Sequence, residues 1–269
     1  MFKTKQKVIQ WLEDMNISNY TVYENLVVDV DGDVNLSRKP LERFPVQFGV
    51  VTGNFECEKC GLTSLEGAPF YVGEDFRCPR NRLTSLKGAP RYVGGNFFGY
   101  GNQLTTLEGG PTYVGGNFWC FFNKLSTLKG APLSVEKDFD CERNQLTSLM
   151  GAPRYVGDGF YCGFNLLTTL VGAPTYIEGN FHCLSNRLAT LEGAPLYVGG
   201  TFDCTSNFLS TLKGAPHYIG DDFDCRGNPL TSLKDAPKHV GGKFLYDQRL
   251  IETLEGAPPY AIESVLYPK

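Results

Sequence analysis

The sequence lacks the features on which membrane proteins and nucleic-acid-binding proteins depend. None of its 269 residues lie in an apolar run long enough to span a bilayer, and the N-terminal MFKTKQKVIQWLEDMNIS contains no apolar core of a secretory signal. Lysine and arginine form no block and the formal net charge is -4, so phosphate groups would meet no basic surface. We therefore expect a cytoplasmic protein that binds neither membrane nor nucleic acid.

The common motifs of catalysis are also missing. The chain has no phosphate-binding loop, nucleophile elbow or H-E-x-x-H motif, and it contains only three histidines. Cys57-x-x-Cys60 has the spacing of a zinc site but lacks two further ligands, since Cys57 belongs to a regular series of eight cysteines. We interpret carboxylates such as Asp140 and Glu142 as solvated surface charge. The sequence thus predicts no enzymatic activity, no metal, no cofactor and reduced thiols.

What the sequence does contain is a repeat. Its 31 glycines and 16 prolines imply frequent turns. Phenylalanine from Phe55 to Phe244 and leucine from Leu65 to Leu254 recur every 21 residues without an insertion. Proline keeps the same spacing, at Pro69, Pro90, Pro111, Pro132, Pro153, Pro174, Pro195, Pro216, Pro237 and Pro258. A fixed period of this length is the signature of a stacked repeat architecture.

One repeat reads F-x-C-x-x-N-x-L-T-S-L-E-G-A-P-x-Y-V-G-G-x, as in residues 76–96. The F-x-C segment alternates as a short strand does, and the following asparagine turns the chain. The proline and the glycine pair exclude a helix on the return path, so we expect it to be extended or turn-like. Stacked coils would pair their strands into one parallel sheet, bury Phe, Cys, Leu and Val in a shared core, and align the asparagines in a ladder.

The ends of the chain depart from the repeat. Val8, Trp11 and Leu12 lie on one face of a predicted helix over Lys3–Met15, which would cover the open end of the core. The first, degenerate coil starts near Val34. We predict an N-terminal cap over residues 1–29, consisting of the helix and a lead-in strand, a repeat solenoid over 30–264 and a C-terminal tail over 265–269.

The pattern F-x-C-x-x-N-x-L-x-x-L resembles the L-x-L-x-x-N-x-L-x-x-L core of leucine-rich repeats, with Phe and Cys in place of two leucines. It is similar to the short bacterial repeats of type III-secreted effectors, and more so to the LTSLEGAP-type repeat proteins of bacteriophage and bacterial genomes. The resemblance implies a mostly β, leucine-rich-repeat-like solenoid of about eleven 21-residue coils with one parallel sheet and a helical N-terminal cap. It implies no particular activity, because this fold hosts unrelated binding roles.

The positions that differ between coils are the candidates for function, because the repeat accounts for the constant ones. With Phe and Cys pointing inward, the residue between them and the two after Cys would point outward from the sheet. These outward positions are rich in aromatic residues in the middle of the chain, where exposed apolar surface commonly marks an interaction site. The candidate partner-binding residues are Phe98, Tyr100, Trp119, Phe121, Phe122, Asp140, Glu142, Arg143, Tyr161, Phe164, His182 and Leu184.

The resulting hypothesis is a non-enzymatic module that binds a protein partner through an aromatic-rich sheet face. If the resemblance to phage proteins is meaningful, the partner is a host protein, such as a defence component, in the host-cell cytoplasm. Two alternatives stay open. The rings would sequester a small aromatic or nucleotide ligand if they line a pocket with converging polar groups. They would instead support a homodimer, or merely shield the sheet, if they pack on a second copy or on one another.

Overall fold

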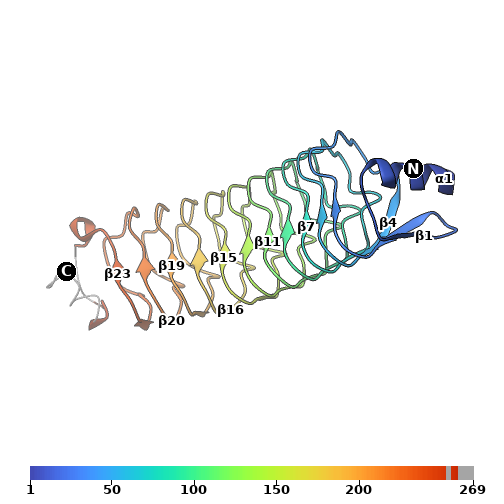
Figure 1. Cartoon of the computed structure of the whole chain (residues 1–269). Coiled ribbons are helices and arrows are strands. Elements are labelled where there is room, and N and C mark those ends of the chain that lie inside the picture. Colours follow the sequence, from blue (N-terminus) through green and yellow to red (C-terminus); the bar gives the residue numbers. More distant parts are fainter. Residues whose placement is uncertain (253–255, 260–269) are drawn as a thin grey trace. The chain divides into compact units, whose positions relative to one another are not determined.

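The computed structural model describes residues 1–252 and 256–259, and the chain forms two compact units, Met1–Lys137 (unit 1) and Asp138–Lys269 (unit 2). Within each unit the chain winds as a mostly β, parallel solenoid of stacked 21-residue coils, as predicted (Figure 1). No break in the repeat marks the boundary at Lys137. The predicted tail over 265–269 and the last residues of the predicted solenoid lie outside the described residues.

Unit 1 contains two rows of short strands. In the first row, here called the Phe row, each strand begins at the repeated phenylalanine or at its equivalent, Val34. Each strand pairs in parallel with the next. The strands are β3 (Val34–Asn35), β5 (Phe55–Glu56), β7 (Phe76–Arg77), β9 (Phe97–Phe98) and β11 (Phe118–Trp119). The second, the Tyr row, is also parallel: β2 (Val27–Val30), β4 (Gln47–Val51), β6 (Tyr71–Val72), β8 (Tyr92–Val93), β10 (Tyr113–Val114) and β12 (Ser134–Val135). β1 (Tyr20–Val22) joins β2 in antiparallel fashion.

Unit 2 repeats this arrangement. Its Phe row consists of β13 (Phe139–Asp140), β15 (Phe160–Tyr161), β17 (Phe181–His182), β19 (Phe202–Asp203), β21 (Phe223–Asp224) and β23 (Phe244–Leu245). Its Tyr row pairs β16 (Tyr176–Ile177), β18 (Tyr197–Val198), β20 (Tyr218–Ile219) and β22 (His239–Val240). β14 (Tyr155–Val156) has the same place in the repeat, and a 3-10 turn, η1 (Gln248–Leu250), follows β23.

The structure corrects the prediction of one parallel sheet, because the return path of each coil also forms a strand. The fixed 21-residue period brings the Tyr-Val segments of neighbouring coils into register as strictly as the Phe segments. Their backbone groups then bond across coils, as when Gly94 N–H donates to Val72 O at 2.9 Å and Gly115 N–H donates to Val93 O at 3.0 Å. Each unit therefore has two strand rows with the core between them.

The core is built from the residues that recur in every coil. The repeated phenylalanines are fully buried and stack on one another, with ring centroids 5.7 Å apart for Phe55 and Phe76 and 4.8 Å apart for Phe97 and Phe118. The two leucines, the cysteine and the valine of each coil fill the remaining space. Stacked aromatic pairs of this kind stabilise the fold beyond the area that they bury.

The predicted asparagine ladder is confirmed. Asn81 is buried, and its amide donates to the carbonyl oxygens of Cys57 and Cys78 at 2.8 and 3.1 Å. Its side-chain oxygen accepts from the N–H groups of Cys60 and Leu62, both at 3.0 Å. Each asparagine thus ties its own turn to that of the preceding coil and satisfies backbone groups that would otherwise be buried without partners.

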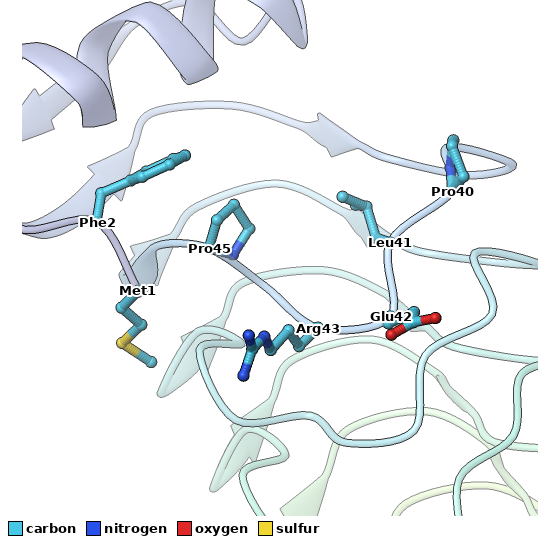
Figure 2. Close-up of a pocket in the computed structure, with 7 residues that line it drawn as sticks. All are labelled: Met1, Phe2, Pro40, Leu41, Glu42, Arg43 and Pro45. Atoms are coloured by element: carbon cyan, nitrogen blue, oxygen red, sulfur yellow. The ribbon is translucent and has the colours of Figure 1, made fainter.

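The N-terminal helix is also where the sequence predicts it. α1 (Lys5–Asp14) buries Val8, Trp11 and Leu12, and Trp11 contacts Phe48 of β4 with ring centroids 6.3 Å apart. In Figure 1 it lies at the start of unit 1, beside β1 and β4. The residues before it run along the loop of the first coil, where Phe2 N–H donates to Pro45 O at 2.8 Å. Met1, Phe2 and this loop line an open hollow of about 370 Å³ (Figure 2).

In the described part of the chain, no helix has the length and apolar character needed to cross a membrane.

Candidate functional site

The Phe row positions the candidate residues. In each two-residue strand the phenylalanine points into the core, and its successor points outward because side chains alternate along a strand. Parallel pairing in register then aligns these outward residues on neighbouring strands, as for Phe98 beside Trp119 and Tyr161 beside His182. The candidate residues divide between the units: those from Phe98 to Phe122 lie in unit 1, and those from Asp140 to Leu184 lie in unit 2.

The unit 1 residues form a cluster of contacting rings, here called the aromatic patch: Phe98, Tyr100, Trp119, Phe121 and Phe122. The Tyr100 and Phe121 rings stack with centroids 4.7 Å apart and an angle of 3°. Trp119 meets Phe98 edge to face at 5.0 Å and Phe121 at 6.2 Å, and Phe121 contacts Phe122 at 5.8 Å. The rings of the patch therefore cover one another in part.

Phe98 is the member whose predicted exposure is wrong. Only 9% of its surface is exposed, because the Arg77 guanidinium lies 4.6 Å from its ring centroid on one side and Trp119 packs against it on the other. Phe98 is therefore the buried member of the patch. The accessible part of the patch consists of Trp119 and Phe121, which are half-buried, and of Phe122. The Phe122 side chain is 54% exposed.

Phe122 also has an uncommon backbone. Its φ is 52°, in the left-handed region that crowds a Cβ atom, and the same turn position is Gly101 in the preceding coil, with a φ of 66°. The coil geometry requires this conformation, and a glycine would adopt it without strain. Instead the turn holds a large aromatic residue outward next to Phe121.

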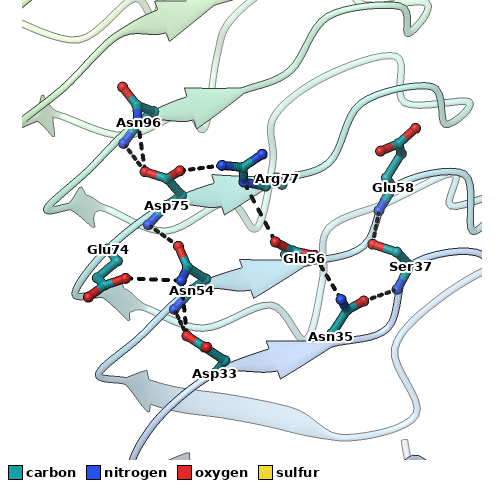
Figure 3. Close-up of polar contacts among 10 residues, drawn as sticks. All are labelled: Asp33, Asn35, Ser37, Asn54, Glu56, Glu58, Glu74, Asp75, Arg77 and Asn96. Atoms are coloured by element: carbon teal, nitrogen blue, oxygen red, sulfur yellow. Dashed lines mark hydrogen bonds and ion pairs between the residues drawn. The ribbon is translucent and has the colours of Figure 1, made fainter.

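Next to the aromatic patch, the same face of unit 1 is polar and internally neutralised (Figure 3). The Arg77 guanidinium bonds Asp75 at 2.7 Å and lies 3.7 Å from Glu56, which also accepts from Asn35 at 2.8 Å. Glu58 lies 3.4 Å from the Arg80 guanidinium. Glu56, Glu58 and Asp75 therefore lie beside basic groups, while Asp33 and Glu74 accept hydrogen bonds from Asn54. The aromatic patch differs from these coils by its apolar character.

Figure 3 also shows a second ladder, which sequence reasoning missed. At the corner before each Phe strand, a side-chain oxygen accepts the backbone N–H of the next coil: Asp33 from Asn54, Asn54 from Asp75, and Asp75 from Asn96, at 2.7, 3.1 and 2.7 Å. The signal was the Asp or Asn that precedes most of the repeated phenylalanines. This ladder is structural, and it accounts for polar residues that would otherwise suggest a ligand site.

In unit 2 the outward side chains of the Phe row form a face of different character, here called the unit 2 face. Along β13, β15, β17 and β19 the aligned residues are Asp140, Tyr161, His182 and Asp203. Tyr161 and His182 touch edge to face with ring centroids 5.0 Å apart. Asp203 was not among the predicted site residues, although it has the same place in the repeat as Asp140.

The carboxylates of this face are not the solvated surface charges that the sequence suggested. The pKa of the Asp140 carboxyl is raised to about 7, mainly by burial, with smaller contributions from the negative charges of Glu142 and Asp138 and against the lowering by its bond from the Glu142 N–H. Burial also raises the pKa of Glu142, the Arg143 guanidinium opposes this, and Asp203 adds to it. Burial lowers the pKa of the His182 imidazole. Charge on this face is therefore poorly solvated.

Two glycines shape the unit 2 face. A Cβ atom at Gly163 would lie 2.9 Å from both Glu142 Oε1 and Leu184 Cδ2, so these two side chains lean together over the glycine. At Gly159, where most other coils carry Asp or Asn, a Cβ atom would lie 2.5 Å from the Tyr161 hydroxyl. The Tyr161 ring takes the space that a corner side chain would need.

The remaining predicted residues, Arg143 and Phe164, occupy the turn after the strand. The Arg143 guanidinium lies 4.3 Å from the Phe164 ring centroid, a cation–π contact between neighbouring coils. Both residues have positive φ, 52° and 54°, like Phe122 in unit 1. They present an exposed ring and an exposed cation at the rim of the unit 2 face.

The tyrosines that follow most of the repeated prolines pack as parts of the scaffold. Tyr176, Tyr197 and Tyr218 stack at 4.4 and 4.8 Å, within 4° of parallel, along the Tyr row of unit 2. Tyr71 and Tyr92 do the same in unit 1, at 4.8 Å. Their ring faces cover one another, so mainly their edges meet solvent.

Metal and thiol chemistry have no support in the geometry. Among the described residues, no group of three or more His, Cys, Asp or Glu side chains is arranged to hold a metal ion. Cys57 is buried in the core, and Cys60, at the asparagine position, directs its sulfur to Leu36 O at 3.0 Å. The hollow in Figure 2 and a second one beside Gln47 are lined by unit 1 residues outside the aromatic patch.

Comparison with known proteins adds little. No protein-family model and no curated protein sequence matches the chain. Among solved structures it is similar to YopM from Yersinia enterocolitica WA-314, with 16% sequence identity and a TM-score of 0.33 over 80% of this chain. The match covers 64% of the YopM chain. A likeness this distant carries nothing about function, and the solenoid assignment rests on the coils of the chain itself.

Proposed function

We propose that the protein is a non-enzymatic recognition module that binds a protein partner through the outward side chains of its Phe rows. The aromatic patch of unit 1 is the observation that supports this most directly. Trp119, Phe121 and Phe122 gather on a sheet face whose neighbouring carboxylates lie beside guanidinium groups, so these rings form the apolar part of that face. Aromatic side chains of this kind are the usual energetic centres of protein interfaces.

Phe122 adds to the proposal because 54% of its side chain is exposed although its ring contacts Phe121. Its left-handed φ is shared by Lys59, Arg80 and Ser206 at the same place in other coils, so this conformation belongs to the repeat. What is particular to Phe122 is the large apolar side chain that this turn carries. By the resemblance to phage-encoded repeat proteins, we further propose a host-cell protein as the partner.

The test is capture of proteins from a cytoplasmic lysate with the tagged chain and with its Trp119→Ala/Phe121→Ala variant. Both residues are half-buried on the surface, so we expect the variant to fold, as circular dichroism will show. We expect it to lose the partner, with affinity falling at least ~30-fold for hot-spot residues. Phe208→Ala removes an exposed ring outside the candidate site and serves as the matched control.

Three results separate the alternatives. Recovery of the same proteins by the wild type and the double variant contradicts the proposal. A dimer in light scattering that becomes a monomer in the double variant assigns the patch to self-association. A small aromatic compound that copurifies with the wild type but not with the variant assigns it to ligand sequestration.

A further inference from the structure

We propose that the unit 2 face docks a basic segment of the protein partner, one that presents lysine or arginine side chains beside an apolar residue. This inference rests on the proposed function and adds the chemistry of the partner. It concerns the sheet face formed by Asp140, Glu142, Tyr161, His182 and Asp203, all of them half-buried.

The first support is the imbalance of charge on this face. In unit 1, Glu56 lies 3.7 Å from a guanidinium, and in the last coils of unit 2 Asp224 bonds Arg226 at 2.6 Å. Over the described residues, by contrast, no lysine or arginine nitrogen lies within 4.0 Å of a carboxylate oxygen of Asp140, Glu142 or Asp203. Arg143 acts on Glu142, and Arg226 on Asp203, from beyond ion-pair distance, so these carboxylates can still accept a direct contact from a cation of a partner.

The second support is their poor solvation. Asp140 and Glu142 both have raised pKa values through burial, and Glu142 also feels the negative charge of Asp203. A cation placed among them would relieve this repulsion, and its attraction is strengthened because water is already partly excluded. A neutral or acidic segment would gain nothing of the kind.

The third support is the apolar surface between the carboxylates. Tyr161 and His182 lie in the row between Asp140 and Asp203, which are three strand spacings or about 14 Å apart. Leu184 leans against Glu142 over Gly163. Lysine and arginine bind along such surfaces by laying their methylene stems on the apolar groups while their charged ends meet carboxylates, and arginine also stacks on tyrosine rings.

The geometry favours a cationic side chain over a bound metal ion. The described carboxylates and histidines do not converge on one point in groups of three. They are spread along the sheet face, as a contact with an extended or flat partner surface requires.

The experiment measures binding of short fluorescent peptides to the full chain by anisotropy. One peptide alternates arginine with leucine and serine, and the second replaces each arginine by glutamate. Asp140→Asn/Asp203→Asn removes two charges and keeps the side-chain oxygens that accept from Glu142 and Thr205 N–H, each at 2.9 Å. Asp221→Asn/Asp235→Asn removes two exposed carboxylates outside this face and matches the net charge.

We expect the arginine peptide to bind and the glutamate peptide not to bind. The Asp140→Asn/Asp203→Asn variant should bind the arginine peptide roughly tenfold more weakly, which corresponds to about 1.4 kcal/mol, and the control variant should match the wild type. Equal losses in the two variants would trace the binding to net charge and overturn the inference. Binding of both peptides, or of neither, overturns it as well.

These outcomes are distinct from failure of the proposed function. Suppose that Trp119→Ala/Phe121→Ala loses the captured protein while the arginine peptide fails to bind the wild type. The proposed recognition module is then supported, and the inference of a basic partner segment is wrong. If capture is unaffected by the Trp119 and Phe121 substitutions, the recognition module itself is wrong.

Discussion

At Phe122 the chain holds a large aromatic residue at a φ of 52°, a conformation that glycine adopts in the preceding coil. Replacing a left-handed residue by glycine relieves a local cost of about 1–2 kcal/mol, part of which is offset by the greater freedom of glycine in the unfolded chain. We expect Phe122→Gly to be about 0.5–1 kcal/mol more stable than Phe122→Ala, as measured by chemical denaturation.

Phe122→Ala is the matched control, because both variants lose the ring and only alanine keeps the crowded Cβ atom. Both should weaken partner binding. A glycine variant no more stable than the alanine variant would show that the turn is not strained.

At Asp140 the expected effect depends on pH. The carboxyl has a pKa of about 7 in the folded protein against an ordinary 3.8, so the folded state holds its proton more tightly than the unfolded chain. Stability from this group is complete below pH 4 and is lost as the pH rises through 7. Glu142 and Asp138 reinforce the effect, while Arg143 acts on Glu142 in the opposite direction.

Asp140→Asn cannot ionise and keeps the bond from Glu142 N–H, so it should be more stable than the wild type above pH 7 and similar to it at pH 4. Because the side chain is only partly buried, we expect about 1–2 kcal/mol at pH 8. Thermal unfolding at the two pH values measures this. Asp224→Asn breaks an ion pair with Arg226 and should gain nothing at pH 8; a gain like that of Asp140→Asn would contradict the explanation.

At the scale of the strand, the sequence predicts the Phe row well because its residues recur without exception and alternate as a strand must. The Tyr row escaped prediction for a physical reason. A Tyr-Val pair between a proline and two glycines looks like a turn within one coil, and its strand character arises only from pairing with the next coil. Pairing between coils is a property of the stack rather than of the segment.

The candidate site shows the same difference between properties of one segment, which the sequence predicts, and properties of the stack, which it does not. The outward direction of Trp119 and Tyr161 follows from alternation, and the structure has both half-buried on the predicted face. The covering of Phe98 by Arg77 and Trp119 depends on side chains of two neighbouring coils. The poor solvation of Asp140 likewise depends on packing, so the sequence alone suggested an ordinary surface charge.

Over the whole chain, stability should be distributed coil by coil, since each coil bonds only its neighbours within a unit. Asn186 is an example of the bonds that join neighbouring coils. Its amide donates to Cys162 O and Cys183 O, both at 3.1 Å, and its side-chain oxygen accepts from Leu167 N–H at 3.0 Å. Asn186→Ala leaves these groups unpaired in the core. We expect a loss of about 2–4 kcal/mol in denaturant unfolding.

Hydrogen exchange should locate the damage. Protection in Asn186→Ala should fall most for amides of the adjoining coils, such as Leu167 and Leu188, and least for α1 in unit 1. Arg187→Ala, an exposed neighbour, should change stability by less than about 0.5 kcal/mol and serves as the control. Uniform loss of protection along the chain would mean that the coils unfold as one cooperative body.

The buried cysteines make it possible to follow the local opening of single coils over time. Burial raises the pKa of thiols such as Cys162, Cys183 and Cys204 well above the ordinary value, so an alkylating reagent finds almost no thiolate while the coils are closed. A thiol reacts once its own coil has separated from the next. Since eight coils carry a cysteine at the same position of the repeat, the labelling rate of each thiol reports how often that coil opens, without any engineered probe.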